Sequence, residues 1–300
     1  CQTSLRAAPD DDVAAMSVGI PCLSTITEIR VALDEARSRG ASVGLVPTMG
    51  ALHEGHLSLI RAARAQNDVV VVSIFVNPTQ FGANEDLAKY PRDLERDRLL
   101  CAEAGAHLIF SPEPGEMYAE PYSTWVDVEG LTGGLCGRSR PGHFRGVCTV
   151  VTKLLNICQP HQAYFGEKDA QQLAVIKRMT RNLDMRVRIV PCPTVREPDG
   201  LAMSSRNARL TPEHRAQAPV LYRALTAAKD LVLAGEQDAA QLDAAVRTIL
   251  AEAPAGEIDY VEIVDADDLT PVDHIEGETL IALAVRFGDV RLIDNMRVSA

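Results

Sequence analysis

The sequence predicts an α/β fold with a doubly wound parallel sheet, followed by a smaller C-terminal α+β domain. Residues 68–76 (DVVVVSIFV) form a β-branched run, which is typical of a strand buried on both faces of a parallel sheet. Strand-like and helix-like segments alternate up to about residue 194. That alternation indicates right-handed crossovers and a Rossmann-like domain. Beyond residue 194, two helical segments precede three strand-like runs.

The individual elements follow from hydrophobic periodicity. A strand is expected at 42–48 (SVGLVPT), followed by a glycine-containing turn and a helix with apolar residues from Leu57 onward. After the 68–76 strand we expect helices at 85–105, 147–157 and 170–182, and strands at 106–110, 163–165 and 186–191. In the C-terminal part we expect one long helix at 213–234, a helix at 238–251, and strands at 258–264, 279–287 and 290–293.

These elements divide the chain into three parts. Residues 1–17 are polar, acidic and without periodicity, which predicts a flexible leader. They lack a basic segment followed by an apolar one, so we do not expect a signal peptide. The Rossmann-like domain is expected at 18–194 and the C-terminal domain at 195–300.

The composition excludes several classes of protein. The formal charge of −11 argues against nucleic-acid binding, which normally needs a basic surplus. No apolar run reaches the roughly 18 to 20 residues of a membrane span. The seven cysteines are odd in number and scattered, which fits a reducing cytoplasm better than a disulfide framework.

The first candidate site is the turn His53-x-Gly-His56, which precedes a predicted helix. A helix N-terminus offers unpaired N–H groups and the positive end of a dipole, and two imidazoles beside it can hydrogen-bond a triphosphate. Gly50 and Gly55 allow close approach of the backbone. Two alternatives are open: a zinc site, although zincins space their histidines four apart, and simple capping of the helix.

Two further groups of residues suit anions. Gly166-Glu167-Lys168-Asp169 follows a short predicted strand, where a parallel sheet places phosphate sites. Met203-Ser204-Ser205-Arg206 supplies two hydroxyls and a guanidinium. Taken alone, the first group is equally typical of a solvated surface, and a helix cap with a surface arginine explains the second better. The Walker A pattern of P-loop enzymes is absent from the sequence.

Three weaker patterns gain weight only in combination. Residues 77–81 (NPTQF) stand where the second strand ends, so that Gln80 can point its amide into the crevice. Residues 141–146 (PGHFRG) form a polar loop that opens a helix, and Gln171 and Gln172 follow Asp169 by one turn. Buried amides satisfy a substrate's hydroxyls and carboxylate without adding charge, although a single glutamine is more often a surface residue.

Together these segments resemble the pantothenate synthetase family, over about residues 20–295. The segments that match the family's motifs, in its order and spacing, are 47–56 (PTMGALHEGH), 75–81 (FVNPTQF), 90–92 (YPR), 141–146, 165–169 with Gln171-Gln172, and 203–207 (MSSRN). The family belongs to the nucleotidylyl transferases with a His-x-Gly-His turn. Met203–Arg206 is also similar to the mobile Lys-Met-Ser-Lys-Ser loop of class I aminoacyl-tRNA synthetases.

The resemblance implies an ATP-dependent, AMP-forming ligase that condenses (R)-pantoate with β-alanine through a pantoyl-adenylate. It implies Mg²⁺ held through the nucleotide phosphates, a homodimer, and no membrane or nucleic-acid partner. The implied ATP-binding residues are Met49, Gly50, Ala51, Leu52, His53, Glu54, Gly55, His56, Gly166, Glu167, Lys168, Asp169, Val195, Met203, Ser204, Ser205 and Arg206. The implied pantoate-binding residues are Pro47, Met49, Gln80 and Gln172, and Gln80 is also implied for β-alanine. The implied catalytic residues are His53, His56 as proton donor, Lys168, Ser204, Ser205 and Arg206.

The sequence departs from the family pattern at two places and leaves rival functions open. Ala170 and Ala208 replace larger residues beside the motifs, which puts local packing in question. One rival transfers a nucleotidyl group to a phosphate and releases a dinucleotide; others are an aminoacyl-tRNA synthetase and an inactive nucleotide-binding regulator.

The implied acyl-adenylate is a mixed anhydride, which hydrolyses readily in water. We therefore expect the C-terminal domain to act as a lid hinged near 195–200.

Overall fold

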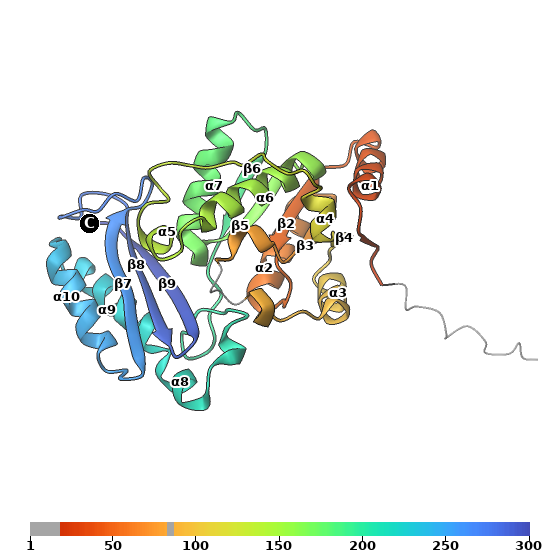
Figure 1. The fold of residues 1–300 in the computed structure, drawn as a ribbon. Coiled ribbons are helices and arrows are strands. Elements are labelled where there is room, and N and C mark those ends of the chain that lie inside the picture. The colour runs from red at the N-terminus through yellow and green to blue at the C-terminus, as the bar shows by residue number, and fades with distance from the viewer. Residues whose placement is uncertain (1–18, 83–86) are drawn as a thin grey trace, which may run out of the picture.

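The structure is a computed structural model and describes residues 19–82 and 87–300. The predicted leader therefore lies outside the described residues. A six-stranded sheet with its helices occupies the N-terminal part of the chain, and a three-stranded sheet with its helices occupies the C-terminal part (Figure 1). No helix of the described ranges has the length and apolarity that crossing a membrane requires.

The first sheet is entirely parallel, with the spatial order β1-β4-β3-β2-β5-β6. Its strands are β1 (Cys22–Leu23), β2 (Val43–Thr48), β3 (Val69–Ile74), β4 (Leu108–Phe110), β5 (Gln162–Gly166) and β6 (Arg188–Cys192). Chain order runs outward from β2 through β3 to β4 on one side and from β5 to β6 on the other, with β1 added at the edge beside β4. The crevice between β2 and β5 at their carboxyl ends is thus the switch point where such sheets bind ligands.

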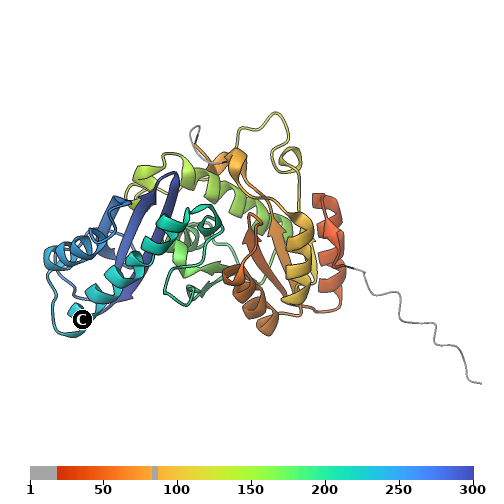
Figure 2. The same cartoon turned by 90° about the horizontal axis from the view of Figure 1, so that it is seen from below.

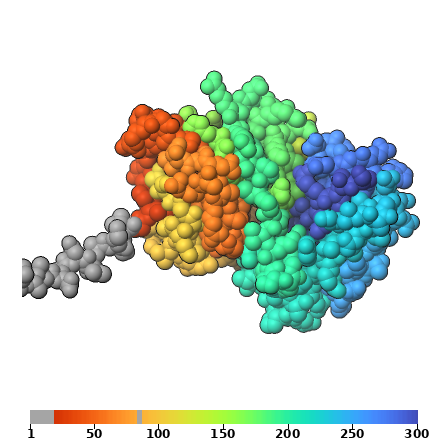
Figure 3. Space-filling view, turned by 180° about the vertical axis from the view of Figure 1, so that it is seen from behind, coloured from red at the N-terminus to blue at the C-terminus, as the bar shows by residue number. Residues whose placement is uncertain are grey.

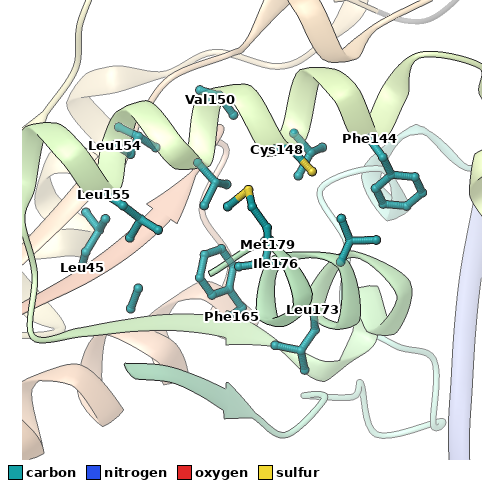
Figure 4. Close-up of a cluster of buried hydrophobic side chains, with 14 of the residues drawn as sticks. Leu45, Phe144, Cys148, Val150, Leu154, Leu155, Phe165, Leu173, Ile176 and Met179 are labelled. Carbon is teal, nitrogen blue, oxygen red and sulfur yellow. The ribbon is translucent and has the colours of Figure 1, made fainter. Parts of the chain in front are cut away.

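Helices cover both faces of this sheet, which makes it doubly wound as predicted. On one face lie α1 (Ile26–Ser38), α6 (His143–Cys158) and α7 (Ala170–Asn182), and on the other lie α2 (Glu54–Gln66) and α3 (Leu94–Glu103). Because successive strand residues point to opposite faces, Leu45 joins the first cluster and Val46 the second. Figure 4 shows Leu45 and Phe165 of the sheet facing side chains of α6 and α7.

The remaining short elements connect these layers. They are the helices α4 (Pro114–Met117) and α5 (Leu135–Ser139), and the 3₁₀ turns η1 (Pro78–Gln80), η2 (Leu87–Lys89), η3 (Glu167–Asp169) and η4 (Asn207–Arg209). Of these, η3 directly follows β5, and η1 follows β3 after residues 75–77, so both stand at the carboxyl edge of the sheet.

The second sheet is antiparallel, with the order β7-β8-β9. Its strands are β7 (Gly256–Asp265), β8 (Thr279–Phe287) and β9 (Val290–Val298), and the helices of this part are α8 (Pro212–Gln217), α9 (Val220–Leu233) and α10 (Ala239–Leu250). One face of β8, with Ile281 and Leu283, packs on α9 and α10, whereas Leu280 and Ala282 on the other face join the core of the first sheet. The two parts therefore lie in direct contact, as Figures 2 and 3 show.

Several expected boundaries are wrong. The single helix at 213–234 is interrupted between Gln217 and Val220, because Pro219 has no N–H and its ring clashes with the preceding turn. The helix at 85–105 begins only at Leu94, where the Asp93 side chain accepts a hydrogen bond from the Arg96 N–H and caps it. Helix α6 starts at residue 143 rather than 147, and β9 runs on to residue 298.

Helix α1 was not predicted, although its start carries a clear signal. Thr25 accepts a hydrogen bond from the Glu28 N–H, and the Glu28 carboxylate accepts one from the Thr25 N–H. This reciprocal pair is a capping box. The Thr-x-x-Glu spacing would have located the helix.

Candidate active site

The candidate site lies where β2 and β5 end. A cavity of about 240 Å³ opens there, at the switch point of the sheet. Most of the predicted site residues line this cavity. They are Pro47, Met49, His53, Gly55, His56, Gln80, Gly166, Lys168, Asp169, Gln172, Val195, Met203, Ser204, Ser205 and Arg206.

The two histidines cap helix α2 and so acquire fixed orientations. The Nδ1 atom of His53 accepts a hydrogen bond from the Gly55 N–H at 3.1 Å, and Nδ1 of His56 accepts one from the His53 N–H at 3.3 Å. The ring centroids lie 4.1 Å apart. Because both Nδ1 atoms are acceptors, each neutral ring carries its proton on Nε2. The capping alternative and the anion-binding interpretation are therefore compatible, since capping leaves Nε2–H available.

The same surroundings keep both rings uncharged. Burial, followed by the positive charge of Lys168, lowers the pKa of His53 to about 4. Burial, followed by the neighbouring His53, lowers the pKa of His56 to about 3. Both pKa values lie well below neutrality, so these side chains offer N–H dipoles to an anion at pH 7 rather than full charges.

Asp97 shapes the turn that leads to the histidines. Its carboxylate oxygens accept hydrogen bonds from the N–H groups of Ala51 and Leu52, both at 2.8 Å, and its side chain is 1% exposed. Burial raises the pKa of Asp97, and the two N–H donors oppose that rise. At Gly50, φ is +79° and a Cβ would lie 2.9 Å from this carboxylate, so the turn requires glycine there.

Five predicted ATP-binding residues do not line the cavity: Gly50, Ala51, Leu52, Glu54 and Glu167. Leu52 is 1% exposed and packs in the core on the α2 face of the sheet. Glu54 forms an ion pair with Arg61 on the surface of α2. Gly50, Ala51 and Leu52 build the turn before α2, whereas Glu54 begins α2 and Glu167 belongs to η3. Contact of these five residues with ATP stays a prediction.

Lys168 projects from the η3 turn beside the histidines. Its Nζ lies 3.8 Å from a carboxylate oxygen of Asp169, and its side chain is 20% exposed. The side-chain amide of Asn295, on β9, donates hydrogen bonds to the backbone oxygens of Glu167 and Lys168 at 3.0 and 2.8 Å. The turn that carries the lysine is thus held from both parts of the molecule.

Gln80 is held in one orientation by a buried neighbour. Asn77, which is 1% exposed, donates from Nδ2 to the Gln80 Oε1 at 3.1 Å. The Gln80 Nε2 group consequently points the other way, to 3.1 Å from the Met49 sulfur, on the wall of the cavity. The sequence prediction that Gln80 presents an amide to the crevice agrees with this geometry.

The loop at 141–146 supports Gln80 from its other side. The Nδ1 atom of His143 donates to the Gln80 backbone oxygen at 2.9 Å, and a guanidinium N–H of Arg140 lies 3.0 Å from Nε2 of the same ring. Gly146 permits this packing, since a Cβ there would lie only 2.4 Å from the Thr79 oxygen. Arg140 and His143 also line the cavity.

The two adjacent glutamines have different roles. Gln171 is 6% exposed and donates to the backbone oxygens of Leu131 and Gly134 at 2.8 and 2.9 Å, so it is a structural residue. Gln172 lies on the wall of the cavity, as predicted for a substrate ligand. One position along a helix turns a side chain by about 100°, which explains the difference.

The segment from Val195 to Arg206 folds back on itself to form the remaining wall. The Met203 N–H donates to the Val195 oxygen at 3.0 Å, and Arg196 pairs with Ala202 in an isolated bridge. The Arg206 guanidinium lies 5.9 Å from the centre of the Tyr90 ring. These contacts bring Met203–Arg206 to the same cavity as the histidines.

A second cavity, of about 700 Å³, adjoins the first and lies between the two sheets. The two share Arg140, His143, Lys168, Asp169, Gln172, Ser204 and Arg206. Together they offer the space of an ordinary ligand site, roughly 300–1,000 Å³. Ala170, one of the two departures from the family pattern, is 9% exposed and lines the larger cavity, whereas Ala208 is exposed on η4.

Sequence reasoning missed three residues whose hydrogen bonds orient the site, two of which also line the larger cavity. Asp97, Asp294 and Asn295 belong to no motif that the sequence displayed. Asp97 gives no signal in the sequence, because it is one of three acidic residues of α3 and only the structure shows that it is the buried one. Asn295 gives no local signal, because its partners lie more than a hundred residues away.

Three segments meet around the switch point of the parallel sheet: the His-x-Gly-His turn, the lysine turn and the Ser-Ser-Arg segment. This arrangement defines a nucleotide-dependent enzyme of the nucleotidylyl-transferring class. The family profile described as "Pantoate-beta-alanine ligase" matches residues 21–297. The chain belongs to the pantoate–β-alanine ligase family.

Curated relatives agree with this assignment. The pantothenate synthetase of Moorella thermoacetica is 60% identical over 274 residues, which cover 91% of this chain and 97% of that protein. The pantothenate synthetase of Thermotoga neapolitana is 56% identical over 273 residues, covering 91% of this chain and 98% of that protein.

Solved structures of the family share the fold. The crystal structure of pantothenate synthetase from Thermus thermophilus superimposes with a TM-score of 0.90 at 49% identity, covering 94% of this chain and all of that one. Pantoate–β-alanine ligase from Francisella tularensis, solved as a complex with "Beta-gamma ATP and Beta-alanine", gives a TM-score of 0.76 at 34% identity, with coverages of 92% and 97%.

Proposed function

We propose that this enzyme condenses (R)-pantoate with β-alanine, using ATP, and releases pantothenate, AMP and diphosphate by way of a pantoyl-adenylate. Family membership over residues 21–297 supports the overall reaction. The observation that carries the proposal is the single crevice that gathers His53, His56, Lys168 and Arg206 from distant parts of the chain.

In the first step a carboxylate oxygen of pantoate attacks the α-phosphorus of ATP, and the bond to the β-phosphate oxygen breaks. Pantoate is already ionised near neutral pH, so its attack needs no general base. The requirement is instead to stabilise negative charge on the α-phosphate and on the departing diphosphate. We assign this role to the Nε2–H groups of His53 and His56 and to Lys168 and Arg206, with the Ser204 and Ser205 hydroxyls.

The role of His56 follows from its pKa. A ring whose pKa is lowered to about 3 is neutral at pH 7. It therefore acts by donating a hydrogen bond from Nε2 rather than by transferring a proton as an imidazolium. This assignment differs from the proton-donor role that the family resemblance implies, and it rests on the lowered pKa.

Pantoate is assigned to the wall formed by Pro47, Met49, Gln80 and Gln172. The oriented Gln80 amide suits a hydroxyl or carboxylate oxygen, and the Met49 sulfur and Pro47 ring suit the dimethyl end of the substrate. β-Alanine is assigned to the vicinity of Gln80. In the second step its amine attacks the acyl carbon of the adenylate, the bond to the phosphate oxygen breaks, and AMP leaves.

A divalent ion such as Mg²⁺ fits these residues only if the nucleotide supplies most of its ligands. The described residues contain no group of three histidine, cysteine or acidic side chains that would hold a metal. Within residues 19–82 and 87–300, Asp169 is the one carboxylate that lines the smaller cavity. Mg²⁺ characteristically binds through substrate phosphates and one or two carboxylates, and it neutralises phosphate charge.

A domain boundary near residue 194 and closure by the C-terminal part belong to the same proposal. The separate hydrophobic cluster around α9 and α10 supports a second domain. The shared packing of Leu280 and Ala282 with the first core favours a small rotation over a wide opening. A nucleotide-bound structure with an unchanged angle between the two sheets would contradict closure. A homodimer, which the family resemblance implies, and a cytoplasmic location, which the scattered cysteines favour, complete the proposal.

One assay tests the proposed reaction. The protein is incubated with ATP, Mg²⁺ and D-pantoate, with and without β-alanine, while diphosphate and AMP are followed. We expect pantoate-dependent ATP–diphosphate exchange without β-alanine, and stoichiometric AMP and pantothenate with it. Release of a dinucleotide, or nucleotide binding without turnover, would refute the proposal in favour of a rival function.

A further inference from the structure

Two adjacent residues of β9 reach from the second sheet to the segments that carry the candidate anion-binding groups. Asn295 contacts the η3 turn, which precedes α7, and Asp294 contacts Arg196, at the start of the segment that leads to Met203–Arg206. Neither contact belongs to the core of the second part. Both contacts therefore connect the second sheet to the candidate site.

Asn295 uses its amide nitrogen to hold the lysine turn at two points. Its Nδ2 atom donates to the Glu167 oxygen at 3.0 Å and to the Lys168 oxygen at 2.8 Å. Within the described part of the chain, the Asp169 side chain makes no capping hydrogen bond at the junction of η3 with α7. The Asn295 amide is thus a side-chain constraint on the backbone of Lys168, and it comes from a strand far away in the sequence.

Asp294 anchors the strand that delivers this amide. Its carboxylate, 1% exposed, accepts two hydrogen bonds from the Arg196 guanidinium at 2.6 and 3.0 Å. The guanidinium also lies 4.2 Å from the centre of the Tyr222 ring. A two-point ion pair fixes direction as well as distance, so β9 is held in register beside the Val195–Arg206 segment.

We propose that Asn295 is a positioning residue that sets the place of Lys168 for adenylation. The inference rests on the proposed function. Asn295 lines the larger cavity but is not assigned to the substrates; it acts through the backbone of the lysine turn. The contact also couples the second sheet to the site, because displacement of β9 would release the turn.

Misplacing a catalytic group by about 1 Å can cost on the order of 100-fold in rate. We therefore expect Asn295→Ala to lower kcat of pantoate-dependent ATP–diphosphate exchange by about 10- to 100-fold, with the KM for pantoate changed less than about 2-fold. Asn295→Asp has the same shape but presents a carboxylate oxygen to two carbonyl oxygens, so its kcat is expected to be lower still. Arg297→Ala is the matched control, since Arg297 lies two residues along β9 and pairs with exposed Glu278.

A double-mutant cycle separates positioning from general loss of structure. If Asn295 acts through Lys168, its substitution should matter little once the Lys168 ammonium is absent. In a Lys168→Ala background we therefore expect Asn295→Ala to lower kcat by less than a further factor of about 3. Thermal denaturation of each variant identifies any that fail to fold, and the Asp variant then carries the test if the Ala variant fails.

Additive effects of the two substitutions, or an Asn295→Ala variant with more than half the wild-type kcat, would overturn this inference. The absence of pantoate-dependent exchange in the wild-type protein would instead refute the proposed function. The two failures are therefore distinguishable in one set of measurements.

Discussion

Removal of the Lys168 ammonium is the most direct perturbation of the proposed chemistry. The side chain is 20% exposed, and its positive charge contributes to the lowered pKa values of both histidines, which places that charge within electrostatic range of the anion site. Loss of one preorganised donor to a transition state costs about 2.7–4 kcal/mol. At about 1.4 kcal/mol per factor of ten, Lys168→Ala should lower the adenylation rate roughly 10²- to 10³-fold.

The measurement is pantoate-dependent ATP–diphosphate exchange, which isolates the first step. Lys168→Met keeps most of the side chain's volume and should lose as much activity, because the charge is what is removed. Lys177→Ala, at an exposed position on α7, is the control and should retain wild-type exchange. The ion pair of Lys168 with half-exposed Asp169 contributes little to stability, so the variants should unfold like the wild type. Exchange within about 3-fold of wild type in either Lys168 variant would remove this residue from the mechanism.

Four other outcomes follow from the geometry. The pKa values of His53 and His56 are lowered to about 4 and about 3, so neither ring should titrate between pH 8 and pH 5.5. A fall of kcat/KM for ATP on the acid side, with a midpoint near pH 6.5, would contradict this. As the pH falls, these two histidines take up protons in the unfolded chain, near pH 6.5, before they do so in the folded protein. The free energy of unfolding should therefore fall as the pH drops below about 6.5, which denaturant titration can measure. Asp97→Asn replaces one of the two carboxylate acceptors with an amide NH₂ group, which is a donor facing a backbone N–H donor, and should lower the free energy of unfolding by about 1–3 kcal/mol. An unchanged denaturation midpoint would refute the role of the carboxylate. Gly146→Ala should displace the 78–80 turn and raise the KM for pantoate, whereas an unchanged KM would show that the turn has room to move.

The sequence was most informative where pattern and structure share a local cause. The β-branched run at 68–76 and the helix at 170–182 were located correctly, because burial on both faces and a 3.6-residue period are visible within a short window. The expected helix at 213–234 is wrong at Pro219, because the apolar spacing that predicted it runs from Leu221 to Val232 and lies entirely after that residue. Periodicity reports the buried face and not the continuity of the backbone.

The sequence allowed residues in short motifs to be placed at one crevice, but not the residues that orient them. The residues at 53, 56, 168 and 206 could be expected at one crevice, because parallel strands bring their carboxyl ends together. Asp97 and Asn295 could not be predicted, since their value depends on backbone groups that only the folded chain brings within reach. Long-range hydrogen bonds leave no periodic trace in the sequence.

The central strand β8 has a consequence for dissecting this enzyme. Leu280, Ala282 and Ala284 would face water if residues 195–300 were produced alone, because their packing partners come from the N-terminal part. Such a fragment would expose a flat apolar sheet face and is expected to self-associate rather than remain a monomer. The reciprocal fragment would lose part of its own core, so separating the chain near residue 194 is expected to destabilise both halves.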